Sequence, residues 1–217
     1  MSKTWQVVAT LLLFFVLLTI TTHLRLWQSF DWEMLVALQA ALPRLVDAPF
    51  SVFTLLGSAE FTGVLFFVLV LCAPTKQRLP LILAFGLATF IELVGKTFIA
   101  QPTTPHHLVR YVSFLKLVMS EKVNTQFSYP SGHALRTTFI VIVLANMIAA
   151  SRLQRNVKLW LYAALSVFEF LMLVSRVYSA EHWATDVIGG GMLGAAFALS
   201  ALQVSIPLPK FLSRKPL

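Results

Sequence analysis

Two histidines and an aspartate stand at the edges of apolar segments, at spacings that could support nucleophilic chemistry. His182 and Asp186 are four residues apart, so on a helix they would share one face. Asp186 could then accept a hydrogen bond from the Nδ1–H of His182 and leave Nε2 free as a nucleophile. Together with His133, these side chains are also a set that zinc uses. Fixed cations are plentiful here and carboxylates are scarce, so the residues favour an anionic ligand.

His133 ends the tetrapeptide Pro-Ser-Gly-His, which runs from Pro130 to His133. Proline and serine are typical of helix starts. A helix start offers free backbone N–H groups and the positive end of the helix dipole, which together can bind a phosphate. Gly132 would let an anion approach the backbone closely, next to Ser131. The alternative is an ordinary capped helix that carries an incidental histidine.

Three basic residues lie close to these histidines in the sequence or near a span end. Arg136 is one turn deeper than the Pro-Ser-Gly-His tetrapeptide, where it would bind an anion or extend back to the membrane surface. Lys96 follows Glu92 by four residues, so the two can pair on one helical face. Arg176 has Glu169 seven residues before it. Glu169 could support Arg176 from behind, or it could be a buried structural group with other partners.

The composition predicts a helical membrane protein of one domain, residues 1–217. Of the 217 residues, 58% are hydrophobic and 12% charged, with a mean hydropathy of +0.79. Charged residues are about half as frequent as in soluble domains. The net charge is +8, and the basic residues fall at the ends of apolar runs, which favours membrane topology over nucleic-acid binding. The single cysteine, Cys72, excludes an intramolecular disulfide and a thiolate zinc site.

Six apolar runs approach the roughly 20 residues that a helix needs to cross a bilayer. The sequence therefore predicts an all-α bundle of six transmembrane helices, at about 7–22, 49–73 (interrupted at 57–60), 79–100, 132–150, 157–176 and 183–204. Residues 31–45 are expected to form an amphipathic helix at the interface. The loop at 101–129 is long and polar enough to carry function.

Six spans would place both termini on one side of the membrane. Nine Lys and Arg residues fall on that side and eight on the other. Three of the eight, Lys96, Arg136 and Arg176, have a possible chemical role, and without them the ratio is nine to five. Because basic residues are enriched in cytoplasmic loops, both termini are predicted to be cytoplasmic. The polar residues described above would then lie on the outer face.

With these residues in view, the chain resembles the type 2 phosphatidic acid phosphatase (PAP2) superfamily. The signature of that family has three blocks: Lys, six residues, Arg-Pro; then Pro-Ser-Gly-His; then Ser-Arg, five residues, His, three residues, Asp. The second block matches at Pro130–His133, and the third at Ser175, Arg176, His182 and Asp186. The resemblance extends to the six-span layout and therefore covers most of the chain.

The first block departs from the family pattern. Lys96 is present, but Thr103 and Thr104 stand where Arg-Pro is expected. A phosphate-binding cation is therefore missing, and either Arg136 or Arg110 could replace it. Arg136 is the better placed, because it is on the same helix as the Pro-Ser-Gly-His histidine. Without a substitute, the site would bind phosphate more weakly or take a different type of phosphate.

The resemblance implies a mechanism without metal or cofactor. His182 would attack phosphorus and form a phosphohistidine, oriented by Asp186, and His133 would protonate the leaving oxygen. Lys96, Arg176, Arg136 and the backbone of Ser131 and Gly132 would hold the phosphoryl oxygens.

The expected partner is a lipid phosphate reached from the bilayer: an isoprenoid pyrophosphate, phosphatidic acid or phosphatidylglycerophosphate. The expected location is a bacterial inner membrane, with the site facing the periplasm. Two alternatives stay open, namely a lipid phosphotransferase on the same scaffold and a non-catalytic protein that binds anionic lipid. The sequence leaves the oligomeric state open.

Overall fold

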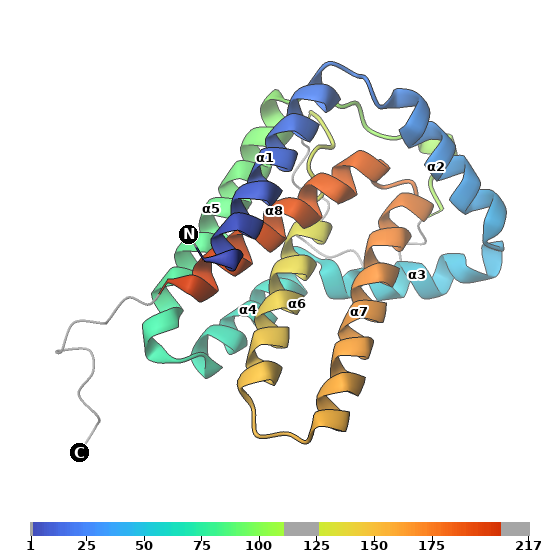
Figure 1. Cartoon of the computed structure of the whole chain (residues 1–217). Helices are drawn as coiled ribbons and strands as arrows, with labels where there is room; N and C mark the ends of the chain where they lie inside the picture. The colour runs from blue at the N-terminus through green and yellow to red at the C-terminus, as the bar shows by residue number, and fades with distance from the viewer. Residues whose placement is uncertain (1, 111–125, 205–217) are drawn as a thin grey trace.

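The computed structural model describes residues 2–110 and 126–204, and all regular secondary structure in these ranges is helical (Figure 1). The all-α prediction is confirmed for this part of the chain. The middle of the loop at 101–129 and the basic residues Lys116, Lys122, Lys210, Arg214 and Lys215 lie outside it. The helices are α1 (Lys3–His23), α2 (Gln28–Ala41), α3 (Asp47–Thr54), α4 (Ala59–Cys72), α5 (Thr75–Phe98), α6 (Gly132–Ala150), α7 (Arg155–Tyr178) and α8 (Ala184–Gln203), with short 3-10 turns η1 (Arg44–Val46), η2 (Leu55–Gly57) and η3 (His106–Leu108).

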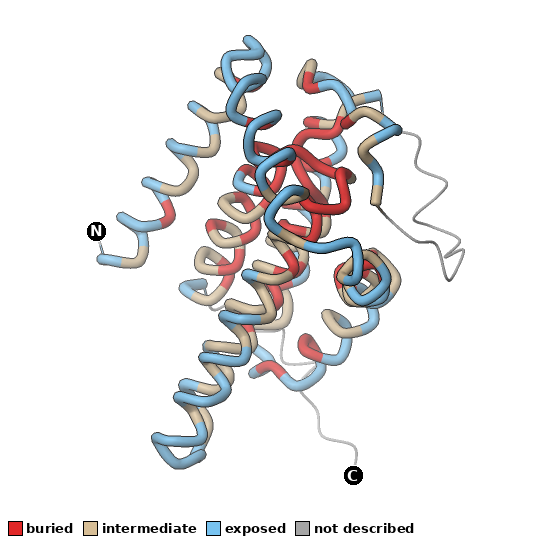
Figure 2. Tube along the Cα trace, turned by 90° about the vertical axis from the view of Figure 1, so that its right-hand side faces the viewer, coloured by how far each residue is buried: buried red, intermediate tan, exposed pale blue. Residues whose placement is uncertain are grey.

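Within the described ranges, five helices are long and apolar enough to cross a membrane: α1, α5, α6, α7 and α8. Their outward faces carry large exposed apolar side chains such as Leu13, Phe90 and Trp160. A helix that is apolar on all sides fits lipid better than water. Figure 2 shows the buried residues gathered toward one end of the bundle, around the segments that connect the helices there. The chain is therefore an integral membrane protein whose packed core is concentrated at that end.

The interruption predicted at 57–60 in the second apolar run, 49–73, is confirmed, and this run does not form one transmembrane helix. The sequence Gly57–Glu60 separates α3 from α4, because Ser58 is extended and caps α4 by accepting from the N–H of Phe61 at 3.2 Å. With 14 residues, α4 is about 21 Å long and the apolar core of a bilayer is about 30 Å thick. Among the described residues, the count of candidate spans rises to six when α2 and the segment Arg44–Gly57, which meet at 96°, are taken as one broken helix.

The predicted interfacial helix at 31–45 corresponds to α2, which begins earlier and ends before Pro43. Proline lacks the N–H that would continue the helix. The start of α1 and the end of α8 lie at the same end of the bundle (Figure 1). The end of α5, the start of α6, the end of α7 and the start of α8 lie at the opposite end, as expected. Which membrane face each end meets stays a prediction, as does the position of α2 at the interface.

Two glycines let α8 lie directly against the backbone of α6. A Cβ atom on Gly190 would be 2.3 Å from the carbonyl oxygen of Ser131, and one on Gly194 would be 2.3 Å from that of Leu135. Glycines four residues apart are typical of membrane helices in backbone contact. The first turns of α6 and α8 are thereby held together, and the N–H of Ser131 donates to the carbonyl of Asp186 at 2.9 Å.

Gly194→Ala tests this close approach. Its Cβ would lie 2.3 Å from the Leu135 carbonyl, so α6 and α8 must separate. We expect a loss of about 1–3 kcal/mol, the usual cost of overpacking, and a lower midpoint of thermal unfolding in detergent. The control is Gly86→Ala on α5, where a Cβ would meet no atom within 4 Å, and its midpoint should be unchanged or slightly raised. Equal midpoints for the two variants would contradict the packing argument.

Candidate active site

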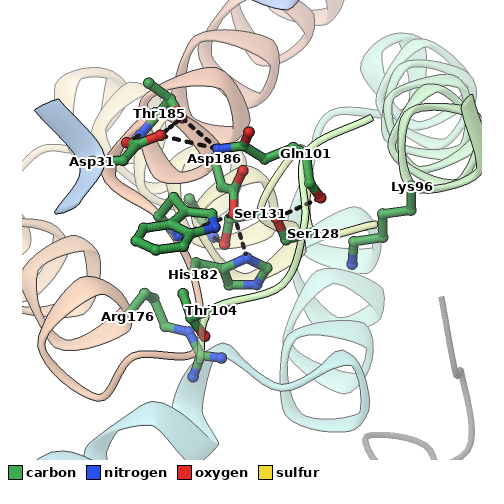
Figure 3. A network of polar contacts seen from close by, with 12 residues as sticks. Asp31, Lys96, Gln101, Thr104, Ser128, Ser131, Arg176, His182, Thr185 and Asp186 are labelled. Atoms are coloured by element: carbon green, nitrogen blue, oxygen red, sulfur yellow. Dashed lines mark hydrogen bonds and ion pairs between the residues drawn. The ribbon is translucent and has the colours of Figure 1, made fainter. Parts of the chain in front are cut away.

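His182 lies in the turn between α7 and α8, beside Asp186 in the first turn of α8 (Figure 3). The Nδ1 atom of His182 is 3.3 Å from Oδ2 of Asp186, whose side chain is fully buried. The same oxygen accepts from the backbone N–H of Trp183 at 3.0 Å. One carboxylate oxygen of Asp186 therefore contacts both the His182 imidazole and the backbone N–H of Trp183, the N-cap residue of α8. With Nδ1 directed at the carboxylate, Nε2 is the ring nitrogen left for a substrate.

The turn that carries His182 folds back onto the end of α7. The N–H groups of Glu181 and His182 both donate to the carbonyl of Arg176, each at 3.2 Å, and Ala180 takes a positive φ of 53°. Burial, and then the nearby Arg176 cation, lower the pKa of His182 well below its ordinary value. Both effects disfavour the protonated ring. The imidazole is therefore neutral at neutral pH, as a nucleophile requires.

The start of α6 differs from the predicted phosphate cradle in one respect. Ser131 caps the helix, and its backbone N–H is engaged by the carbonyl of Asp186 at 2.9 Å. Because this N–H is already engaged, it is not available to a phosphate. The expectation that the Ser131 backbone helps to bind phosphate is therefore wrong. The N–H groups of Gly132 and His133 lie in the first turn and have no partner within the helix. These two groups are the remaining candidates for an anion.

Glu92 of α5 connects two of the expected cations. Its Oε1 accepts from Nζ of Lys96 at 2.8 Å, and its Oε2 is 3.3 Å from a guanidinium nitrogen of Arg136 on α6. The carboxylate also lies against Gly132, where an added Cβ would be 2.0 Å from Oε1. Helical spacing predicted the pair with Lys96. It could not show the contact with Arg136, which joins two helices.

The third expected cation, Arg176, has a different partner from the one considered. Its guanidinium pairs with Glu181 at 2.6 Å. Glu169 does not support Arg176, because it accepts hydrogen bonds from the hydroxyls of Thr137 and Thr138 on α6. The Nε atoms of Arg136 and Arg176 are buried without a hydrogen-bond partner among the described residues. Buried arginine N–H groups of this kind are suited to an anion.

The structure distinguishes the two candidates for the missing first-block cation. The guanidinium of Arg110 donates to the carbonyl of Gln39 and to the hydroxyl of Tyr178, both at 3.1 Å. Arg110 therefore connects α2 and α7, whereas Arg136 lies beside Glu92 and Lys96. Thr103 is exposed, and Thr104 is buried with its hydroxyl donating to the carbonyl of Ala180, close to Arg176 (Figure 3).

His133 faces the break between α3 and α4. A Cβ atom on Gly57 would be 2.8 Å from Cδ2 of His133 and 3.0 Å from Sδ of Met172. The turn η2, at the interruption predicted in the run 49–73, therefore lies against His133. Searching residues 2–110 and 126–204 finds no group of three or more His, Cys, Asp or Glu side chains that could hold a metal ion.

The described residues define an all-helical membrane protein with two histidines, a buried aspartate and several cations gathered at one end of the bundle. The family model of the PAP2 superfamily matches residues 77–207. The chain belongs to this superfamily, which confirms the resemblance drawn from its motifs.

Two curated relatives are named as phosphatases. An undecaprenyl-diphosphatase of Sulfolobus acidocaldarius is 30% identical over 129 residues, which cover 59% of this chain and 55% of the relative. The match therefore spans about half the length of that protein. Phosphatidylglycerophosphatase B of Bacillus subtilis is 27% identical over 196 residues, which cover 85% of this chain and 88% of the relative.

Two solved structures share the fold. The PAP2-type phosphatidylglycerolphosphate phosphatase of Bacillus subtilis aligns with a TM-score of 0.72 at 23% identity, over 90% of this chain and 94% of that one. LpxE of Aquifex aeolicus aligns with a TM-score of 0.57 at 28% identity, over 79% of this chain and 94% of that one. The first likeness is evidence for the fold alone.

The lowered pKa of His182 can be measured directly. In protein with isotope-labelled histidine in detergent, the signal that disappears in His182→Ala belongs to this residue. We expect it to keep the chemical shift of a neutral ring at pH 6.5, where an unperturbed histidine with a pKa of about 6.5 is half protonated. A titration midpoint at or above pH 6.5 would contradict the effect of burial and Arg176.

Proposed function

We propose that the protein is a membrane lipid-phosphate phosphatase that acts through a phosphohistidine on His182. The observation that carries the proposal is the His182–Asp186 pair, held at 3.3 Å beside Arg176 and the start of α6. A protein that only binds anionic lipid has no need of a neutral, oriented imidazole. The two curated relatives, both named as phosphatases of lipid phosphates, support the same reaction class.

The reaction proceeds in two displacements at phosphorus. Nε2 of His182 attacks, the bond from phosphorus to the leaving oxygen breaks, and His133 gives its proton to that oxygen. Asp186 keeps Nδ1–H oriented and stabilises the positive charge that the phosphorylated ring carries. Water then attacks the phosphohistidine and passes a proton to His133, which releases inorganic phosphate and restores both histidines.

The cations supply the electrostatic part of catalysis. Phosphoryl transfer depends mostly on positioning and on stabilising charge on the equatorial oxygens. Lys96, Arg176 and Arg136 would bind these oxygens, together with the N–H groups of Gly132 and His133. Arg136 takes the place of the arginine that the first block lacks, because Arg110 is engaged between α2 and α7. An incoming phosphate shares these cations with the carboxylates that neutralise them in the resting protein.

The substrate is a lipid whose tail stays in the bilayer while its phosphate enters at the end of the bundle. An isoprenoid pyrophosphate, phosphatidic acid and phosphatidylglycerophosphate all meet this description. The two relatives, an undecaprenyl-diphosphatase and a phosphatidylglycerophosphatase, support a polyprenyl diphosphate or a phosphatidylglycerol phosphate. The distribution of basic residues supports a site on the outer face of a bacterial inner membrane.

His182→Ala tests the nucleophile. Purified protein in detergent with EDTA should release phosphate from at least one of these lipids, and the variant should lose about 10³-fold or more of kcat. The control is His107→Ala, which changes an exposed histidine of η3 and should leave the rate unchanged.

Three results of this assay would go against the proposal. No turnover of any lipid by the wild type would exclude the hydrolase. Phosphate transfer that occurs only after a lipid alcohol is added would show a phosphotransferase. Loss of wild-type activity on adding EDTA would show that a metal ion takes part.

Arg136→Ala tests the substitute cation. Removing one charge-assisted contact of about 1.5–3 kcal/mol should lower kcat/KM by about 10- to 100-fold. Adding Thr103→Arg, at an exposed position, should recover part of the loss by restoring the family pattern. Arg152→Ala, which changes an exposed residue in the connection between α6 and α7, is the control. Unchanged kcat/KM in Arg136→Ala would show that Arg136 serves only to pair with Glu92.

A further inference from the structure

A buried carboxylate outside the three signature blocks holds all three together. Asp31 of α2 is only 2% exposed and accepts three hydrogen bonds (Figure 3). Its Oδ1 accepts from the backbone N–H of Thr185 at 2.9 Å. Its Oδ2 accepts from the hydroxyl of Thr185 at 2.7 Å and from the side-chain amide of Gln101 at 3.0 Å.

The contact with Thr185 controls the first turn of α8. Thr185 directly precedes Asp186, and the N–H groups of a first helical turn have no partner within the helix. Asp31 satisfies one of them from a different helix, and its negative charge lies at the favourable end of the helix dipole. The rotation of that turn determines where the Asp186 carboxylate points, and with it the His182 ring.

The contact with Gln101 reaches the other two blocks. Gln101 lies between Lys96 and the position where the family has its arginine. The backbone carbonyl of Gln101 accepts from the N–H of Ser128 at 3.1 Å and from its hydroxyl at 3.3 Å. Ser128 is two residues before Pro130, where the Pro-Ser-Gly-His tetrapeptide begins. Asp31 therefore connects the Lys96 segment, the approach to α6 and the start of α8.

Removing a hydrogen-bond donor from the buried Asp31 carboxylate would cost free energy of folding. A buried carboxylate is tolerated only when donors surround it, and removal of one partner leaves an uncompensated polar group. Asp31 has three donors in fixed directions, all from the segments that carry the site. These three hydrogen bonds come from Thr185 and Gln101, not from His133, His182 or Asp186.

We propose that Asp31 is a positioning residue, which aligns the His182–Asp186 pair with the start of α6 by holding Thr185 and Gln101 from α2. This role rests on the proposed phosphatase function. A misalignment of about 1 Å at the reacting atoms can lower a rate by about 10²-fold. Loss of Asp31 should therefore act on kcat, while KM, which reflects binding by the cations, changes little.

The first test exchanges a donor and an acceptor. Asp31→Asn removes the negative charge and one of the two acceptor oxygens, so at least one of the three hydrogen bonds donated by Thr185 and Gln101 is lost. We expect kcat per active molecule to fall about 10- to 100-fold with KM within about threefold. The double variant Asp31→Asn with Gln101→Glu restores a donor–acceptor pair, and kcat should return to within about threefold of the wild type. Active molecules are counted from the amount of trapped phosphohistidine.

A control separates positioning from general stability. Asp47→Asn makes the same chemical change at a carboxylate that accepts from the hydroxyl of Tyr178 at 2.5 Å and joins α3 to α7. It should lower the thermal midpoint in detergent without changing kcat. If Asp31→Asn does not fold, Thr185→Val still tests the contact, because it removes only the hydroxyl at constant size. Its kcat should fall about 3- to 10-fold, and Thr185→Ser should keep the wild-type value.

The outcomes are distinguishable. A wild-type protein that turns over no lipid phosphate overturns the proposed function and this role with it. An active wild type whose kcat is unchanged in Asp31→Asn, or in Thr185→Val if the first variant does not fold, overturns the positioning role alone. A fall in kcat that Gln101→Glu does not rescue, together with an unchanged kcat in Thr185→Val, also overturns it, because neither contact would then be the cause.

Discussion

The hydrogen bond from the N–H of Ser131 to the carbonyl of Asp186 is the contact on which the site depends. It joins the first turns of α6 and α8, the two helices that carry the Pro-Ser-Gly-His and His-Asp segments. The bond can form because Gly190 and Gly194 let the two backbones touch, since any Cβ at either position would hold them apart. Without that approach His133, in the first turn of α6, and His182, in the turn before α8, would not be held in one site.

The basic side chains of the site form ion pairs with carboxylates. A cation buried in a membrane protein is expensive unless a partner or water surrounds it. Here Glu92 serves both Lys96 and Arg136, and Glu181 serves Arg176. These pairs neutralise the cations in the structure. Under the proposed function, a phosphate would compete with the carboxylates for these cations.

The interruption of the second apolar run contributes to the site, because it places the turn η2 against His133. Hydropathy grouped residues 49–73 into one interrupted span because the apolar content on both sides of the break is high. In the structure α3 and α4 are separate, and η2 between them brings Gly57 under His133. A continuous helix would leave no such turn. Non-helical backbone at membrane depth is tolerated where protein surrounds it.

The sequence by itself determined the membrane class, the all-helical fold, the family and the candidate residues for the chemistry. These follow from apolar run length, helix-start residues and spacings of three to seven positions, which are local properties. The tertiary structure decided the partners. Arg136 meets Glu92 across 44 positions and Asp31 meets Thr185 across 154, and helical periodicity relates only residues three or four apart. Which carboxylate faces which cation depends on how α2, α5, α6 and α8 pack, because packing alone brings distant helix faces into contact.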